Sequence, residues 1–523
     1  MPAEIELKLA IDPAAIAALL RHPALRAAKA GRAQRERLRS TYFDAPAFPL
    51  ADRGVGLRLR EEPRRWVQAV KGPPMPETSG ALVARDEHQW VLQDGKLDPA
   101  LLATTPWAPL LARVVRSEGF GPRFVTDFER RTLPLRLGAA TRALLCIDRG
   151  VIVTADGLRQ REISEIEIEL VNGDPVELFV LAAALAADLP LSMVLAGKAA
   201  RGVTLVRGRP DGWDVPVRAE AIEFPREATV AVALAATLRE CVRQIAANAP
   251  GLLADADPEW VHQMRIGTRR LRACLGLIAP LLPPPGIEPL IAEVRWLAGL
   301  LGAVRDIDVF TDSTLRPLAR ALSGDLAEPA LERLRDAAIA EQHRVRQAAR
   351  QAVASARCTR LLLAGAALAM APEFGAAPAA AGSDRPDERA ASFAARHLKR
   401  RHARLLHRAR KSPAAQAEEL HAMRIATKKM RYAAEFFAGA FSPARRVRAF
   451  VAALAEMQDA LGQQNDAVAA VRLARELAGD DPVRAVGAGA VSAWVAARRE
   501  LRYAALVTAA KRYRKARPFW HDG

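Results

Sequence analysis

The stretch Glu4-Ile5-Glu6-Leu7-Lys8 (EIELK) alternates charged and apolar residues with a period of two. In a β-strand this period places Glu4, Glu6 and Lys8 on one face and the apolar residues on the other. Taken alone, such a stretch is typical of a half-exposed strand with a solvated charged face. A second stretch of the same kind changes that interpretation.

This second stretch, EIEIEL at residues 165–170, places the three carboxylates of Glu165, Glu167 and Glu169 on one strand face. Like charges side by side repel one another, so this face is unfavourable unless cations neutralise it. Carboxylate oxygens are the ligands that Mg²⁺ and Mn²⁺ prefer. The sequence therefore predicts a divalent metal site.

Cationic residues show the same alternation, because Arg58 and Arg60 in GLRLR share a strand face. Further candidates in this part of the chain are Lys71, Arg85, Arg130 and Lys198. A triphosphate needs guanidinium groups, lysines and metal ions together, since its negative charge must be neutralised before a nucleophile can approach phosphorus. The combined charges favour a phosphate site over a solvated surface.

The chain changes character near residue 210. Before it, runs with strand periodicity are separated by Pro, Gly and Asp turns: EIELKLAI, GLRLR, RWVQAVK, ALLCIDRG and ISEIEIEL. After residue 220, helical periodicity is found at 226–249, 258–282, 330–371, 389–410 and 416–440. The prediction is a two-domain α+β protein with a β-rich domain at 1–210 and an all-α domain at 222–515, joined through GRPDGWDVP (208–216).

The helical half contains an internal repeat. VHQMRIGTRRLRACLGLI (261–278) aligns with LHAMRIATKKMRYAAEFF (420–437), and LGAVRD (301–306) aligns with LGQQND (461–466). Because the match extends beyond one helix, it predicts a duplicated helical bundle. The two repeats span about 222–370 and 389–515, and an Ala/Gly/Pro-rich linker at 371–388 separates them.

Each repeat carries a basic helix face without an acidic residue. The four positions recur at 0, +3, +7 and +10, within an arc of about 80°. They are His262, Arg265, Arg269 and Arg272 in the first copy, and His421, Arg424, Lys428 and Arg431 in the second. A solvated face is the ordinary alternative, but such a face usually mixes charges of both signs.

The helix predicted at 393–411 adds eight cationic residues and no acid. Its histidines, His397, His402 and His407, are five residues apart and so cannot converge on one metal ion. We expect them to be surface cations.

Composition points to a folded protein that binds anions. The net charge is +18, of which +5 falls on residues 1–210 and +13 on residues 211–523. Four cysteines without metal-ligand spacing predict small core residues in a reducing compartment. The acidic start of the chain is unlike a signal peptide, and the apolar runs are shorter than a membrane span. A cytoplasmic protein without membrane contact is expected.

The first half resembles the CYTH superfamily of triphosphate tunnel metalloenzymes over about residues 3–207. The matching segments are EIELK, YFDAP (42–46), LRLR (57–60), VKG (70–72), ARDEH (84–88), TDFERR (126–131), CIDRG (146–150), EIEIEL and KAARG (198–202). The resemblance implies an antiparallel barrel with charged side chains in its tunnel, flanked by helices. It also implies hydrolysis of inorganic triphosphate to pyrophosphate and phosphate, by attack of a metal-oriented water on the terminal phosphorus.

Carried onto this sequence, the resemblance assigns the binding of Mg²⁺ or Mn²⁺ to Glu4, Glu6, Glu165, Glu167 and Glu169. Glu87 and Asp148 are expected to be further acidic residues of the tunnel wall. It assigns phosphate binding to Lys8, Arg58, Arg60, Lys71, Arg85, Arg130 and Lys198. Catalytic roles fall on Lys8, Glu4 and Glu6, and Lys8 is a candidate general base. Two positions depart from the family: Ala69 stands where threonine is common, and Gly197 where serine is common.

The second half resembles the CHAD domain, the conserved-histidine α-helical domain, over about residues 222–515. The resemblance rests on the pattern HxMRIxT[RK][RK][LM]R, which occurs twice with LGxx[RN]D after each copy. It implies polyphosphate binding through the two basic faces, with Asp306 and Asp466 orienting the cations, and a location at polyphosphate granules. Nucleic acid is the second candidate ligand, disfavoured because only 5% of the residues are aromatic.

Three alternatives to a triphosphatase remain open at this point. The chain could be a non-catalytic polyphosphate-binding protein, which the two departures at Ala69 and Gly197 weakly support. It could also be a class IV adenylate cyclase or a thiamine triphosphatase. The sequence does not indicate the oligomeric state.

Overall fold

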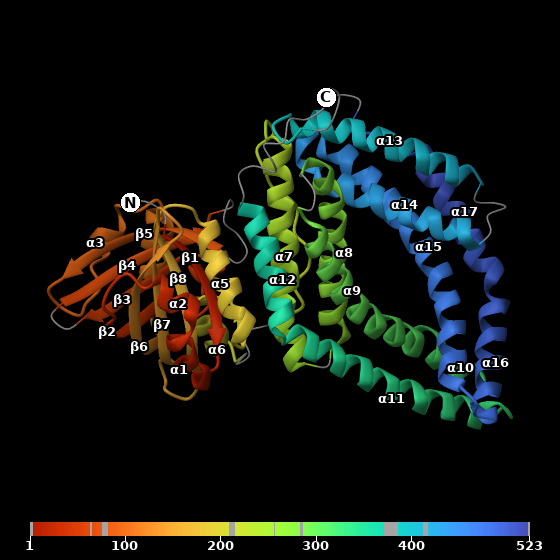
Figure 1. Cartoon of the computed structure of the whole chain (residues 1–523), viewed down its shortest axis with the longest axis horizontal. Coiled ribbons are helices and arrows are strands. Elements are labelled where there is room, and N and C mark those ends of the chain that lie inside the picture. Colours follow the sequence, from red (N-terminus) through yellow and green to blue (C-terminus); the bar gives the residue numbers. More distant parts are fainter. Residues whose placement is uncertain are drawn as a thin grey trace. The chain divides into compact units, whose positions relative to one another are not determined.

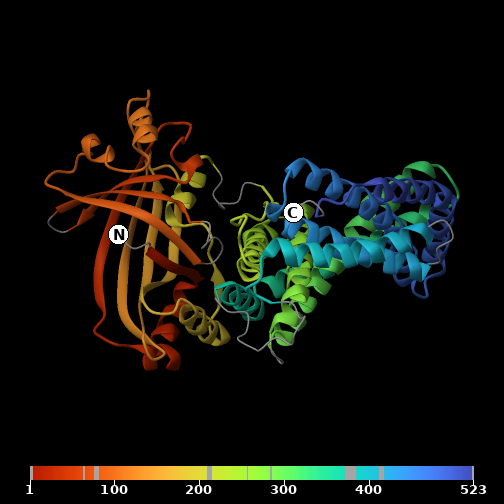
Figure 2. The ribbon, with the colours of Figure 1, turned by 90° about the horizontal axis from the view of Figure 1, so that it is seen from above.

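A computed structural model describes residues 4–62, 65–75, 82–208, 215–255, 257–282, 286–370, 385–411 and 417–520. Contacts divide the chain into two compact units. The first comprises residues 1–218 with 242–256 and 353–371, and the second comprises 219–241 with 257–352 and 372–523. The strands of the first unit and the helices of the second are coloured along the chain in Figures 1 and 2.

The first unit is built on a closed antiparallel barrel. Its strands follow the order β5-β4-β3-β2-β6-β7-β8-β1, and β1 pairs with β5 to close the ring, while β9 adds to the end of β1. The strands are β1 (Glu4–Ile11), β2 (Gln34–Asp44), β3 (Gly56–Glu62), β4 (Arg65–Pro74), β5 (Leu82–Leu92), β6 (Gly121–Leu137), β7 (Thr141–Thr154), β8 (Gln160–Asn172) and β9 (Leu191–Met193). The predicted tunnel barrel is confirmed.

Strand register brings the charged faces together inside the barrel. Lys8 on β1 lies opposite Glu167 on β8. Asp148 on β7 lies opposite Glu165 on β8, and also opposite Arg130 on β6. The period of two then carries each apolar face outward, where it must be covered.

Short helices cover those outer faces. Leu102 in α3 (Pro99–Leu102) and Leu111 in α4 (Ala108–Val115) pack with Leu57 and Val70 of the barrel wall in one buried cluster. The other helices of this part of the chain are α1 (Ile16–Arg21), α2 (Pro23–Ala28), α5 (Val176–Asp188) and α6 (Lys198–Val206). The patterning of the first half, polar inside and apolar outside, follows from this arrangement.

Helix α6 packs inside the barrel rather than on it. Its Val203 clusters with Phe124 and Phe128 of β6, which share a strand face with Arg130. Gly202 lies so close to Phe124 that a Cβ atom there would be 2.2 Å from the ring. Because α6 begins at Lys198, this packing fixes that lysine in the tunnel.

The second unit is helical, and one of its helices is shared. The helices that follow the barrel in the chain are α7 (Val230–Ala254), α8 (Pro258–Ile278), α9 (Glu288–Val309), α10 (Arg316–Ala321), α11 (Glu328–Val353), α12 (Ala356–Met370), α13 (Ala390–Lys411), α14 (Ala417–Phe436), α15 (Ala444–Ala478), α16 (Pro482–Ala497) and α17 (Arg499–Lys515). The second half of α7 and all of α12 belong to the first unit by contact. There the hydroxyl of Thr359 on α12 donates a hydrogen bond of 2.6 Å to the carbonyl of Leu191.

The two repeats meet in a reciprocal backbone pairing. The amide of Val230 donates to the carbonyl of Glu388, and the amide of Ala390 donates to the carbonyl of Ala228. Thr229 and Arg389 form an antiparallel bridge between these bonds. Residues far apart in the sequence therefore exchange equivalent bonds, as expected where a pseudo-twofold axis relates two copies of one unit.

Two details differ from the sequence expectations. The helical run predicted at 330–371 is two helices, α11 and α12, and α9 continues into a π-helical turn at Phe310–Leu315 where α15 is uninterrupted. Most of the predicted linkers, at 209–214 and 371–384, lie outside the described residues. Among the described residues no single helix could cross a membrane; α11 and α12 reach the required length and composition only as a bent pair.

Candidate functional site

A cavity of about 420 Å³ lies inside the barrel and is lined by charged residues from the strands and from α6. Every cation that the sequence assigned to phosphate binding reaches it. These residues are Lys8, Arg58, Arg60, Lys71, Arg85, Arg130 and Lys198. The cations are spread over the chain from residue 8 to residue 198, so only the closed barrel brings them together.

One wall of the cavity is rich in carboxylates. Glu6, Glu167 and Glu169 line the cavity, and one oxygen from each lies within 4.8 Å of the other two. Glu6 and Glu167 are only 6% and 4% exposed. Glu4 pairs through its backbone with Arg85, but its side chain lies outside the described residues.

A second set of carboxylates lies beneath this wall. Asp148, Glu165 and Glu167 also approach one another within 4.8 Å. Neither Asp148 nor Glu165 lines the cavity, and both are fully buried. The ammonium of Lys198 is 2.6 Å from Asp148 and 3.0 Å from Glu167, and it also contacts Glu165.

Arg201 is a site residue that the sequence reasoning missed. Its guanidinium contacts Glu165, and the residue is only 8% exposed. The signal was present in KAARG, where Arg201 follows Lys198 by three residues and so shares its helix face. Arg201 therefore contacts one carboxylate oxygen of Glu165, and Lys198 contacts the other.

Arg130 joins the two carboxylate sets. It forms a two-pronged bond to Asp148, with distances of 2.8 and 2.7 Å, lies 3.1 Å from Glu169 and contacts Glu167. Burial opposes its charge, but Glu167 and Asp148 outweigh burial and raise its pKa well above the ordinary value. Burial likewise disfavours the charge of Glu167, but Lys198, Lys8 and Arg130 hold its pKa well below the ordinary value.

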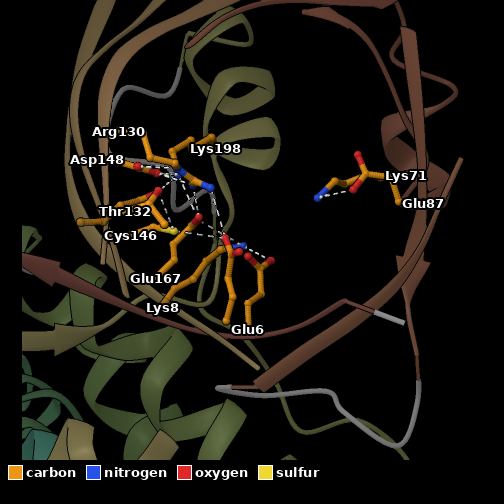
Figure 3. Close-up of polar contacts among 12 residues, drawn as sticks. Glu6, Lys8, Lys71, Glu87, Arg130, Thr132, Cys146, Asp148, Glu167 and Lys198 are labelled. Carbon is orange, nitrogen blue, oxygen red and sulfur yellow. Dashed lines mark hydrogen bonds and ion pairs between the residues drawn. The ribbon is translucent and has the colours of Figure 1, made fainter. Parts of the chain in front are cut away.

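The opposite wall is cationic. Figure 3 shows Lys71 and Glu87 across the lumen from the carboxylate wall. Glu87 lies 2.8 Å from Arg58 and 3.1 Å from Lys71, and these cations lower its pKa against the effect of burial. Burial and the neighbouring Arg58 lower the pKa of Arg60 to about 10. Tyr42, which was not predicted as a site residue, also lines this cavity. Burial would raise the pKa of its phenol, but Arg58 outweighs burial and lowers the pKa.

The cavity-facing carboxylates fit a hard divalent cation. Glu6, Glu167 and Glu169 offer three oxygen donors, each within reach of the same point, and they open on the cavity. Oxygen donors of this kind suit Mg²⁺ or Mn²⁺. Asp148 and Glu165 do not line the cavity, and their contacts with Arg130, Lys198 and Arg201 hold the cations of this set in place.

Lys8 is held as an ammonium ion in this arrangement. Burial would lower its pKa, but Glu167 and Glu6 outweigh burial and raise the pKa above the ordinary value. Its ammonium contacts Glu6 and lies 3.6 Å from Glu167. A lysine kept protonated suits phosphate binding better than proton abstraction, so its role as general base stays a prediction.

The second unit brings its two basic helix faces together. Arg265 and Arg269 on α8 and Arg424 and Lys428 on α14, here called the dyad cluster, lie close enough to shift one another's pKa values. Burial and the neighbouring Arg424, Arg269 and Arg265 lower the pKa of Lys428 to about 7. Like charges held this close make the dyad cluster strongly electropositive.

Acidic residues meet the edges of these basic faces. Asp306 on α9 lies 3.5 Å from Arg265. Burial lowers the pKa of Arg424, and the negative charge of Asp466 on α15 opposes that effect. The expectation that neither face contains an acid is wrong for the second copy, because Glu435 continues its face and binds Arg431 at 2.7 Å. Arg272 is exposed at the corresponding end of the first copy.

The histidines of the two faces differ. His262 is half-buried, and burial together with Arg305 lowers its pKa, whereas His421 is exposed. The expectation of surface histidines on α13 is wrong for His402. Its ring packs among Phe450, Tyr513 and Trp520 and shares a 2.6 Å hydrogen bond with the Tyr513 hydroxyl.

Comparison with known proteins agrees with both architectures. A model described as the CYTH domain matches residues 2–202, and one described as the CHAD domain matches residues 236–475. The inorganic triphosphatase of Haemophilus influenzae is 30% identical over 217 residues, which are 39% of this chain and 54% of that protein. The chain thus matches about half the length of this curated relative.

Two solved structures are also similar. The CHAD domain from the plant Ricinus communis is 34% identical, with a TM-score of 0.49, and covers 57% of this chain and 96% of its own. A Hippeastrum protein, described as an adenylyl cyclase with a dominant triphosphatase activity, is 19% identical with a TM-score of 0.28, over 38% of this chain and 95% of its own. The two family matches by themselves show that this chain belongs to the proteins that carry a CYTH domain (residues 2–202) followed by a CHAD domain (residues 236–475).

Proposed function

We propose that the barrel hydrolyses inorganic triphosphate (tripolyphosphate) to pyrophosphate and phosphate with Mg²⁺ or Mn²⁺, and that the helical unit binds polyphosphate. The observation that carries the first part is one cavity with a carboxylate wall and a facing cationic wall. The curated relative named an inorganic triphosphatase supports the same reaction class. The dyad cluster supports the second part.

The cavity can exchange one set of ion pairs for another. Without substrate, Lys8, Arg130 and Lys198 neutralise Glu6, Glu167 and Glu169. When bound, a divalent ion supplies positive charge to the carboxylates and to the phosphate oxygens. Lys8, Arg130 and Lys198 would then be free to bind the triphosphate, whose negative charge they would share with the divalent ion.

The facing wall fixes the position of the phosphate chain. Arg58 and Arg60 project from neighbouring positions of one strand face, and Glu87 holds Arg58 and Lys71 in place at 2.8 and 3.1 Å. Guanidinium forks bind phosphate oxygens in pairs, and lysine acts as a point charge. Binding at both walls would hold the anhydride bond in line for attack.

A substrate panel tests the proposal. The full-length protein is incubated with tripolyphosphate, thiamine triphosphate, ATP or long-chain polyphosphate, each with Mg²⁺, Mn²⁺ or EDTA. We expect phosphate release from tripolyphosphate that EDTA abolishes. Inactivity on every triphosphate would instead favour a non-catalytic polyphosphate-binding protein, and cyclic AMP formation from ATP would favour a cyclase.

Location follows from the same chemistry. A protein that binds polyphosphate should accumulate where the polymer does, which places it at polyphosphate granules in the cytoplasm. Fluorescence microscopy of the tagged chain in cells with and without polyphosphate synthesis tests this proposal. A distribution that does not depend on the polymer would contradict it.

A further inference from the structure

Helix α13 (Ala390–Lys411) carries a charge that neither the barrel nor the dyad cluster uses. Eight of its residues are cationic and none is acidic. The long helix α11 of the same unit is an internal comparison, because it has five arginines but also four acids, and Arg344 pairs with Glu341 there at 2.6 Å. Acidic residues therefore offset most of the positive charge on α11, whereas no acidic residue of α13 offsets the positive charge there.

The cations of α13 lie on the outer side of the helix. Arg400, Arg404 and Arg408 follow one another every four residues and are all exposed, with a rise of about 6 Å per step. Leu398 and Leu405 on the inner side are fully buried. Further exposed cations on the outer side are Lys399 and Arg410. The helix thus presents a row of guanidinium groups rather than an isolated charge.

The row is only partly satisfied by the protein itself. Within the described part of the chain, neither Arg404 nor Arg408 has a hydrogen-bond or ion-pair partner. Like charges four residues apart destabilise a helix. An arrangement that costs stability without internal compensation points to an external anion.

The corresponding helix of the first repeat shows that the row is not a consequence of the duplication. Thr229 and Arg389 are equivalent at the backbone pairing between the repeats, so α7 and α13 begin at equivalent places. The charged residues of α7 are Arg239, Glu240 and Arg243, and most of the helix is buried. The charge of α13 is therefore a feature of the second repeat alone.

We propose that the outer face of α13 is a second polyanion-binding surface, which holds linear polyphosphate beyond the length bound at the dyad cluster. This proposal rests on the proposed function of the helical unit. The five residues 412–416 join α13 to α14, which carries Arg424 and Lys428, and the two helices pack together. A phosphate chain bound at one helix can therefore continue onto the other.

The chemistry of the face favours polyphosphate over other polyanions. Its outer side offers guanidinium and ammonium groups, and among its described side chains only the imidazole of His407, with no Phe, Tyr or Trp, could stack on a base. Leu398, Leu405 and Ala409, the apolar residues that would enter a lipid surface, are buried in the unit. Charge along a flexible chain is the recognition that remains.

Binding of long-chain polyphosphate to the full-length protein, measured over a range of salt concentrations, tests the proposal. The triple variant R400A/R404A/R408A should bind about tenfold more weakly, and its slope of log affinity against log salt should fall by about two. The matched control R295A/R320A/R335A removes three exposed arginines from α9, α10 and α11 of the same unit and should bind like the unchanged protein. Equal melting temperatures and equal tripolyphosphate hydrolysis show that all variants are folded.

A parallel variant, R269A/K428A, distinguishes the two proposals. Loss of affinity in R269A/K428A but not in the α13 variant would overturn the second surface and leave the dyad cluster standing. No binding of polyphosphate by the unchanged protein would overturn both. If the α13 variant and its matched control lost the same affinity for polyphosphate, the loss would reflect only the lower net charge of the protein. That result would overturn the second surface. Weakened binding of single-stranded DNA by the α13 variant, with polyphosphate binding unchanged, would make nucleic acid the occupant and would also overturn it.

Discussion

The barrel and the dyad cluster both gather cations, but they balance them differently. In the barrel, Lys8, Arg130 and Lys198 each contact carboxylates, as Lys198 contacts Asp148, Glu165 and Glu167. In the dyad cluster the principal neighbours of Lys428 are other cations, Arg424, Arg269 and Arg265. The cations of the carboxylate wall are thus balanced by acids, whereas positive charge is in excess in the dyad cluster.

This difference in charge balance predicts that the barrel can catalyse a reaction and that the dyad cluster can only bind. Paired carboxylates can exchange a lysine or arginine for a metal ion, which a reaction at phosphorus requires. A cluster of cations alone can bind a polyanion but offers no ligand for a metal ion. Catalysis should therefore be sensitive to single carboxylates, whereas polymer binding should depend on several neighbouring cations acting together.

Replacing the shared carboxylate should give the largest effect. Glu167→Gln removes the charge that Lys8, Arg130 and Lys198 share, and we expect tripolyphosphate hydrolysis to fall by at least about 100-fold. Phosphate release with Mg²⁺ or Mn²⁺ measures it. The exposed Glu162 on the same strand provides the matched control, Glu162→Gln. Near-normal activity in Glu167→Gln would contradict the proposed metal site.

The double variant R269A/K428A should weaken polyphosphate binding by about 30-fold, because it removes one charge from each side of the dyad cluster. Hydrolysis in the barrel should be unaffected. Arg431 is already paired with Glu435, so Arg431→Ala should have a smaller effect. Equal losses in the two variants, measured by titration at fixed salt, would argue against the cluster as the binding centre.

Binding to the dyad cluster should depend on pH near neutrality. With a pKa lowered to about 7, Lys428 gains its charge as the pH falls through 7, so affinity should be about threefold higher at pH 6 than at pH 8. Arginine keeps its charge throughout, so Lys428→Arg should flatten the dependence. Burial lowers this pKa most, followed by Arg424, Arg269 and Arg265, and Asp466 opposes them. An unchanged profile in Lys428→Arg would assign the dependence to another group.

The lowered pKa of Lys428 also predicts how folding stability depends on pH. Affinity should fall as the pH rises, whereas stability should increase. Folding lowers the pKa of Lys428 below its unfolded value, so the unfolded chain binds more protons between pH 7 and about 10.5. The contribution of Lys428 to folding stability should therefore rise with pH in that window. Chemical denaturation of Lys428→Met against the unchanged protein at pH 6 and pH 9 measures this term, and a difference that did not shrink at pH 9 would contradict it.

The smallest effect is expected from the acid beside the cluster. Asp306 lies 3.5 Å from Arg265, and both groups are partly exposed, so the pair should contribute less than about 1 kcal/mol. Asp306→Asn removes a negative charge near the phosphate path and should raise polyphosphate affinity a few-fold. A fall in affinity would show instead that Asp306 acts chiefly by orienting Arg265.

Much of the barrel was determined by local sequence. Because β-strand side chains alternate with a period of two, the order of residues alone places Glu6, Lys8, Glu167 and Glu169 on polar faces. The duplication is equally visible, since 261–278 and 420–437 match along their length. Local periodicity and self-similarity are properties of the chain, and they need no tertiary information.

Only the tertiary structure decided which of those residues act together. Barrel closure separated Glu167, which opens on the cavity, from Glu165, which lies beneath it, although both occupy the same strand face. It also added Arg201 and Tyr42, whose roles depend on contacts with distant strands. In the second unit the pairing between the repeats joined Arg269 to Lys428, and packing enclosed His402 among aromatic rings, although its spacing had predicted the surface. Periodicity fixes the direction of a side chain along its own element, whereas burial and partners depend on the elements that pack against it.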